Sequence, residues 1–142
     1  MEAVGWKEYV DFVEWGVRRV KAKIDTGART SALDVASYEL SEDGPGLTAV
    51  LRLPLSRRHP ERLTVVRVPV LGMVVVSNSS GGRELRPLIE TTIRLGRVEK
   101  RIRLTVTNRA GMRFRMILGR KALEGDFLVD VSQKYLLRRH GP

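Results

Sequence analysis

The sequence predicts an all-β domain, a small barrel or sandwich built from short strands. Apolar and charged residues alternate with a period of two through 89–95 and again through 98–106, the strongest periodic pattern in the chain. Turn-forming sequences interrupt the chain at short intervals, and no stretch has the apolar spacing of a long amphipathic helix. The length of 142 residues suits one ordinary domain, so we expect a single domain over 1–142.

The first half of the chain contains five expected strands. Their apolar patterns place them near 9–13, 17–24, 37–40, 47–53 and 63–70. Pro69 predicts a sheet edge or a strand end in the last of these, because proline cannot donate a hydrogen bond to a neighbouring strand. The basic, turn-rich segment 54–62 is interpreted as an exposed loop.

The second half is expected to continue in the same way. A strand at 73–76 leads into a polar hairpin tip over 77–84 that contains two adjacent glycines. The two alternating strands follow, then a strand at 114–118 and a single short helix over 120–124, which Gly125 closes. The last strand candidates are 127–131 and 135–137.

Composition excludes several classes of chemistry. The chain has no cysteine, which excludes disulfides, thiol nucleophiles and thiolate metal sites. Its two histidines, His59 and His140, form no metal-binding motif, so we expect neither a metal nor a cofactor. No apolar run approaches the roughly 18 residues that span a bilayer. The N-terminal residues also lack the pattern of a secretory signal, and we expect a cytoplasmic protein.

The net charge of +10 predicts attraction to an acidic partner. Nucleic acid, anionic lipid and acidic peptide all fit this charge, and so does an arginine-rich surface without a specific partner.

Two short segments carry the candidate chemistry. In the first, Asp25 follows an apolar strand, and Thr26 and Gly27 follow it at once. These three residue types favour a turn, so the chain is expected to present this carboxylate rather than bury it. The second segment, 116–120, comes about ninety residues later and contains two apolar residues before Gly119. A glycine there permits close backbone approach to the first segment.

Four segments in order, 22–33, 84–87, 107–109 and 114–123, resemble the bacterial retropepsin-like aspartic endopeptidases. That family was formerly called ATP-dependent zinc proteases and is associated with ATP-grasp glutamate ligases. The resemblance implies a retropepsin-like closed six-stranded barrel with one short C-terminal helix, and it implies peptide-bond hydrolysis. The cysteine and histidine content gives no support to the zinc of the older name.

The resemblance also assigns roles to individual residues. It implies catalysis by Asp25, Thr26 and Gly27, and substrate binding by Ala28, Arg29, Ser79, Ser80, Gly81, Gly82 and Arg120. Amide hydrolysis of this class needs two carboxylates that share one proton and one water. Since the chain holds a single Asp-Thr-Gly segment, the second carboxylate is expected from Asp25 of a two-fold-related copy. We therefore expect a homodimer that acts on a peptide or protein.

Arg29 departs from the retroviral pattern, which has an acidic residue that pairs with the arginine of the Gly-Arg segment. Arg29 and Arg120 cannot pair with each other, and their internal candidate partners are Glu84, Asp126 and Asp130. If Arg29 is left free, it favours acidic side chains, so we expect an acidic or glutamate-rich peptide substrate.

Two other functions remain open. One is a catalytically silent peptide-binding or regulatory module with the same fold. The other is a basic β-barrel that binds nucleic acid. It is less favoured, because aromatic residues make up only 6% of the chain and no stacking platform is evident on the strands.

Overall fold

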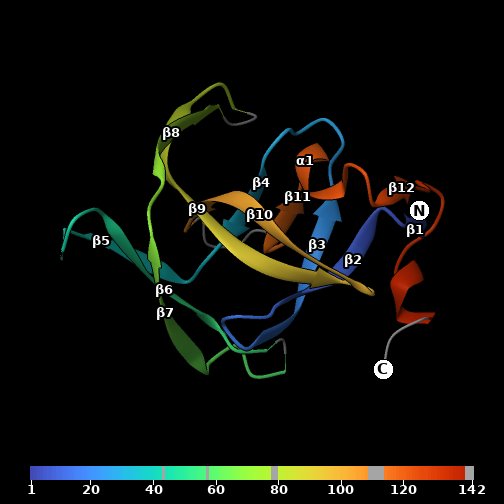
Figure 1. The fold of residues 1–142 in the computed structure, drawn as a ribbon, viewed down its shortest axis with the longest axis horizontal. Helices are drawn as coiled ribbons and strands as arrows, with labels where there is room; N and C mark the ends of the chain where they lie inside the picture. The colour runs from blue at the N-terminus through green and yellow to red at the C-terminus, as the bar shows by residue number, and fades with distance from the viewer. Residues whose placement is uncertain (43, 57, 78–79, 109–113, 140–142) are drawn as a thin grey trace.

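Six strands close into a barrel in the computed structural model, which describes residues 1–42, 44–56, 58–77, 80–108 and 114–139 (Figure 1). The strand order is β10-β4-β11-β3-β2-β9, and β9 pairs back onto β10. These strands are β2 (Lys7–Phe12), β3 (Val17–Ile24), β4 (Ser31–Asp34), β9 (Arg83–Leu95), β10 (Val98–Thr107) and β11 (Met116–Leu118). The predicted closed six-stranded, all-β barrel is confirmed.

The barrel core comes from the alternation that dominates the sequence. Ile89, Ile93 and Leu95 of β9 are fully buried, and their charged neighbours along the strand face outward. Leu104 of β10 lies directly opposite Ile89 in the antiparallel register and is fully buried too. A period of two puts one side of each strand into the core, which is why this hairpin could be predicted locally.

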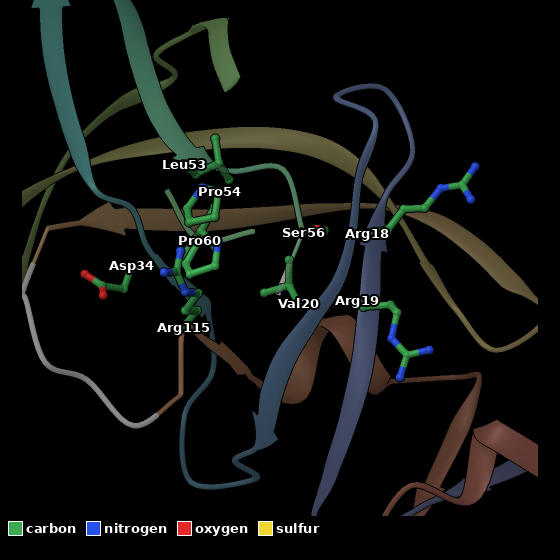
Figure 2. A pocket seen from close by; sticks show the side chains of 10 residues that line it. Arg18, Arg19, Val20, Asp34, Leu53, Pro54, Ser56, Pro60 and Arg115 are labelled. Atoms are coloured by element: carbon green, nitrogen blue, oxygen red, sulfur yellow. The ribbon is translucent and has the colours of Figure 1, made fainter. Parts of the chain in front are cut away.

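A three-stranded sheet packs beside the barrel. It consists of β5 (Ser37–Ser41), β6 (Thr48–Pro54) and β7 (Leu63–Pro69), with β6 in the middle. Leu51 and Leu53 of β6 are buried and join the main core. A cavity of about 130 Å³ is lined by this sheet and the barrel, with Val20, Pro60 and Arg115 among its lining residues (Figure 2).

The strand β8 (Gly72–Ser77) forms a hairpin with β9, from Gly72 opposite Leu88 to Ser77 opposite Arg83. Within the described residues, β8 pairs with no strand other than β9. Figure 1 shows this β8–β9 hairpin projecting from the barrel on the same side as the loop that joins β3 to β4. Its position matches the hairpin predicted between 73–76 and 89–95.

The two ends of the chain pack together. The strands β1 (Glu2–Val4) and β12 (Phe127–Val129) pair in parallel, α1 (Arg120–Leu123) precedes β12, and η1 (Leu136–Arg139) ends the described chain. The strands β1 and β4 were not predicted. Among the described residues, no helix has the length and apolar character needed to cross a bilayer.

The prediction of a strand at 135–137 was wrong. Residues 136–139 form a 3-10 helix, and Glu8 explains why. The carboxylate of Glu8 is buried and accepts the backbone N–H groups of Leu136 at 3.0 Å and Leu137 at 3.3 Å. It also accepts the N–H of Gly5 at 2.7 Å. A buried side chain satisfies N–H groups that a strand would have given to a neighbouring strand.

Candidate functional site

The turn after β3 presents Asp25. Its N–H donates to the carbonyl of Leu118 at 2.9 Å, which continues the parallel pairing of β3 with β11. The side chain is half-buried, and Oδ1 accepts the N–H of Gly27 at 3.0 Å. That bond is the usual turn-stabilising bond of an aspartate. Within the described residues, no basic side chain lies within 4.0 Å of the carboxylate.

Gly119 packs directly against this turn, as the sequence predicted. A Cβ atom on Gly119 would lie 2.8 Å from the carbonyl carbon of Thr30 and 2.9 Å from the carbonyl oxygen of Ala28. The N–H of Gly119 donates to the buried hydroxyl of Ser31 at 3.1 Å. Glycine is required here because two backbone segments approach more closely than any side chain allows.

The first residues of α1 hold the far side of the same turn. The N–H of Arg120 donates to the carbonyl of Ala28 at 2.7 Å, and the N–H of Lys121 donates to that of Arg29 at 3.1 Å. The guanidinium of Arg120 reaches the carbonyl of Thr26 at 2.9 Å. Arg120, which the sequence suggested for substrate binding, therefore contacts the candidate catalytic turn itself.

Two grooves meet at Arg29. The first has a volume of about 630 Å³ and is lined by Thr26, Arg29, Arg120, Lys121, Leu123, Glu124, Phe127 and Val129. The second has a volume of about 500 Å³ and is lined by Arg29, Thr30, Leu88, Glu90, Arg101, Ile102, Arg103, Lys121 and Ala122. Arg29 is exposed, and no carboxylate of the described residues lies within 4.0 Å of its guanidinium.

Glu84, one expected partner of the two arginines, is engaged within the β8–β9 hairpin, where it lies opposite Val76. It pairs with Arg86, whose guanidinium donates from Nε at 3.1 Å and from Nη2 at 2.9 Å to the same carboxylate oxygen. The other oxygen of Glu84 accepts the hydroxyl of Thr107 at 3.0 Å. Arg86 is 6% exposed, so this group of three ties the hairpin to the end of β10.

The other two expected partners also lie elsewhere. Asp126 pairs with Lys100 at 2.7 Å. Asp130 accepts the hydroxyl and the N–H of Ser132, and these hydrogen bonds hold the pKa of Asp130 below its ordinary value. None of the three predicted carboxylates pairs with Arg29 or Arg120.

The predicted hairpin tip is described in part. Ser80, Gly81 and Gly82 are exposed, and Gly81 has a φ of 85°, which glycine adopts without strain. Ser79 lies outside the described residues.

Sequence reasoning gave no individual role to Ser31, Arg86 or Thr107. Glu84 and Arg86 stand two residues apart on a strand, so they share one face, and this spacing is the one signal that predicts their pairing. The contacts of Ser31 and Thr107 join segments far apart in sequence and leave no local pattern. Within the described residues, no group of three or more histidine, aspartate or glutamate side chains could hold a metal ion.

A protein-family model described as retropepsin-like aspartic endopeptidase RimB matches residues 3–140. The chain belongs to this RimB-like family. The match includes the Asp25 turn, the β8–β9 hairpin and the Gly119–Arg120 segment, so the recognition made from those segments is confirmed.

Relatives of this RimB-like chain include two proteins named "Probable alpha-L-glutamate ligase". The one from Desulfotalea psychrophila is 35% identical over an alignment of 130 positions that covers 89% of this chain and 27% of the relative. The one from Parasynechococcus marenigrum is 36% identical over an alignment of 142 positions that covers 94% of this chain and 29% of the relative. The chain thus spans less than a third of the length of these curated relatives.

A solved structure shows the same fold. It is a Legionella pneumophila protein of unknown function, and it superimposes with a TM-score of 0.76 over 96% of this chain and 98% of that one. Because the two sequences are only 20% identical, this likeness concerns the RimB-like fold alone.

Proposed function

We propose that this chain is an aspartic endopeptidase whose active site forms across a homodimer. The observation that carries the proposal is the Asp25 turn. Leu118, Gly119 and Arg120 contact its backbone and fix its position, while its carboxylate stays accessible. Such bracing fixes the position of a reacting group before substrate arrives. Membership of a retropepsin-like family supports the same activity.

Asp25 from each of two copies would supply the chemistry. One carboxylate takes a proton from a bound water, and the resulting hydroxide forms a C–O bond to the substrate carbonyl carbon. The other carboxyl group, protonated, donates a hydrogen bond to the carbonyl oxygen as negative charge develops there. Transfer of a proton to the amide nitrogen then allows the C–N bond to break. Two close carboxylates hold one proton between them because like charges in contact resist full ionisation.

Three other features support the assignment of substrate contacts. Thr26 and Gly27 are exposed beside the carboxylate, where an extended peptide backbone could run past the turn. Ser80, Gly81 and Gly82 end a hairpin that projects on the same side of the barrel, in the position of a lid that closes over substrate. Ser79 belongs to the same proposed lid.

An acidic or glutamate-rich peptide is the proposed substrate. Arg29 and Lys121 line both grooves beside the turn, and Arg101 and Arg103 line the second one. Arg101 and Arg103 share the carboxylate of Glu90 at 3.5 and 3.7 Å, and Arg101 also pairs with Glu14 at 3.1 Å. Among the residues that line the second groove, three arginines and one lysine accompany one carboxylate, so positive charge is in excess there. A cytoplasmic location remains the prediction from the sequence.

The first test replaces Asp25 by asparagine. Cleavage of a peptide library by Asp25→Asn should fall at least a thousandfold, because the amide cannot take a proton from water. The matched control is Asp126→Asn, which removes a carboxylate outside the two grooves and should keep most of the activity. Full activity in Asp25→Asn would end the proposal.

A mixing experiment tests the shared dyad. Wild type and Asp25→Asn are mixed in varied ratios, unfolded and refolded together, and the cleavage activity of each mixture is measured. If each site needs one Asp25 from each copy, activity should follow the square of the wild-type fraction. A linear dependence would show that one copy contains a complete site.

The substrate class has its own test. Glutamate-rich peptides should be cleaved with a kcat/KM about tenfold above that of neutral peptides of equal length, since no carboxylate of the described residues pairs with Arg29. Arg29→Ala should remove most of this preference and leave cleavage of the neutral peptides similar. An unchanged preference in Arg29→Ala would contradict the assignment.

The names of the relatives favour a second candidate function. In them, a region like this chain forms part of a protein named as a glutamate ligase, which suits a peptide-binding or regulatory module that works beside a ligase. Binding of glutamate-rich peptides without turnover, over a broad pH range, would support this candidate against the endopeptidase.

A further inference from the structure

The outer surface of β2 and β3 gathers basic and aromatic side chains. We name it the cation–aromatic face, and its members are Trp6, Lys7, Tyr9, Arg19, Lys21, Lys23, Phe114 and Tyr135. Four of the chain's eight aromatic residues lie here, all of them partly exposed. Neither the proposed dyad nor the two grooves at Arg29 include any of these residues.

The rings and cations of this face form one continuous arrangement. Tyr9 stacks on Tyr135 with ring centroids 4.6 Å apart and planes inclined by 10°. The guanidinium of Arg19 lies 4.7 Å from the centroid of Tyr9. The ammonium of Lys7 lies 5.2 Å from Tyr135 and 4.7 Å from Trp6.

The arrangement continues across β3. Trp6 meets Phe114 edge to face at 6.0 Å, and the ammonium of Lys21 lies 5.2 Å from the Phe114 ring. Contacts of this kind restrain the positions of charged side chains that would otherwise move freely in solvent. The rings thus hold Lys7, Arg19 and Lys21 in place on one surface.

A backbone irregularity helps to present the arginines. The pairing of β2 with β3 shifts between Val10 and Phe12, so that Arg18 and Arg19 form a bulge beside Asp11. Arg19 has a φ of 56°, which is unfavourable for a residue with a Cβ, and its N–H donates to Asp11 at 2.9 Å. Arg18 and Arg19 are among the lining residues of the cavity in Figure 2, where the ends of their side chains extend to the same side, away from Val20 and Pro60. Bulges of this kind re-aim side chains.

Three cations of this face, Arg19, Lys21 and Lys23, have no carboxylate partner among the described residues. Lys7 lies directly opposite Lys23 in the β2–β3 register, and like charges in that position destabilise a sheet. No carboxylate of the described residues lies within 4.0 Å of the charged groups of Arg19, Lys21 or Lys23. Repulsion between these cations would be relieved by an anionic ligand bound to this face.

We propose that the cation–aromatic face binds single-stranded nucleic acid. Lys7, Lys21 and Lys23 supply charge to the phosphates. The stack of Tyr135, Tyr9 and Arg19 ends in an exposed guanidinium plane on which a base can lie. An acidic peptide would use the same cations but has no flat group to extend that stack. This function is independent of the Asp25 dyad.

The test measures fluorescence anisotropy of labelled 20-nucleotide uridine RNA and thymidine DNA with the full chain over a salt series. The variant Arg19→Gln/Lys21→Gln/Lys23→Gln should bind at least tenfold more weakly than wild type. The slope of log affinity against log salt should also become shallower by about 1.4, from the lost phosphate contacts of Lys21 and Lys23. The control Arg58→Gln/Arg62→Gln/Arg97→Gln removes three other exposed charges and should change affinity less than threefold. Urea midpoints of both variants establish that each folds.

A second arm separates stacking from charge. Wild type should bind the thymidine oligomer about tenfold more tightly than an abasic phosphodiester of equal length, and Arg19→Gln alone should reduce this ratio. A difference in affinity between the RNA and DNA oligomers then shows which sugar the cation–aromatic face prefers. Equal losses in the two triple variants, or displacement by a glutamate peptide as effective as by the oligomer, would overturn the proposal.

Discussion

The loop from Asp25 to Thr30 and the β8–β9 hairpin project from the same side of the barrel, yet they are held in different ways. Hydrogen bonds hold the loop along its length: the N–H of Asp25 donates to the carbonyl of Leu118, and the N–H of Arg120 donates to the carbonyl of Ala28. The hairpin is joined to the barrel by Glu84 and Arg86, which lie opposite Val76 and Val74 in the hairpin and contact each other and Thr107. Among the described residues β8 pairs with β9 alone, and Val75 and Leu85 are more than half exposed.

This difference suits the proposed division of labour. A group that takes a proton from water needs a fixed position, because small displacements slow the reaction strongly. A lid must open and close, so it is drawn from a region with few buried contacts. Gly119 lets the backbone pack closely against the loop, whereas the described residues of the hairpin tip are exposed.

Replacing Arg86, which ties the hairpin to the end of β10, should have the largest effect on stability. Arg86→Ala should lower the free energy of unfolding by about 3 kcal/mol, because it removes a buried guanidinium and leaves the Glu84 carboxylate without that partner. The control Arg94→Ala breaks the exposed pair with Glu99 and should cost less than about 1 kcal/mol. Urea denaturation at fixed protein concentration measures both, and equal losses would contradict a special role for the buried pair.

Adding a methyl group at Gly119, which packs against the loop, should have the next largest effect on stability. Gly119→Ala should destabilise the fold by about 2 kcal/mol and reduce peptide cleavage, because its Cβ would meet backbone atoms of Ala28 and Thr30 at less than 3.0 Å. Gly72→Ala is the matched change at the hairpin, where a Cβ meets no atom within 4 Å, and it should be nearly neutral. Thermal unfolding and kcat of both variants check this, and a neutral Gly119→Ala would mean that the loop is not rigidly packed.

The smallest expected change in stability comes from the Arg120 side chain. Arg120→Gln loses the bond to the Thr26 carbonyl and should cost about 1 kcal/mol, since the guanidinium is exposed to solvent. If Arg120 positions the catalytic turn, kcat should fall about tenfold with KM little changed, and Arg120→Lys should restore part of the loss. Arg94→Gln, which affects an exposed pair with Glu99 outside the two grooves, should leave kcat unaltered. A change in KM alone would assign Arg120 to substrate binding instead.

Local patterns explain which elements the sequence could predict. Apolar and polar residues alternate along consecutive positions of the β9–β10 hairpin, and the short helix could be predicted from the residues next to Gly125. The strand β4 has only four residues, and its partners β10 and β11 lie far along the chain, so no local signal identifies it. The prediction at 135–137 failed because Glu8, 128 residues before Leu136, takes its N–H group. The extent of a single domain over 1–142 stays a prediction.

The sequence by itself determined that the chain is an all-β barrel with one exposed Asp-Thr-Gly turn and a glycine-containing segment able to pack against it. Those features depend on residue type and on spacing along the chain, which can be read without coordinates. Only the tertiary structure decided that Arg120 holds the Thr26 carbonyl, that Glu84 belongs to Arg86, and that basic and aromatic residues share one surface. Each of these depends on which strands become neighbours when the barrel closes, and on side-chain directions that the barrel fixes.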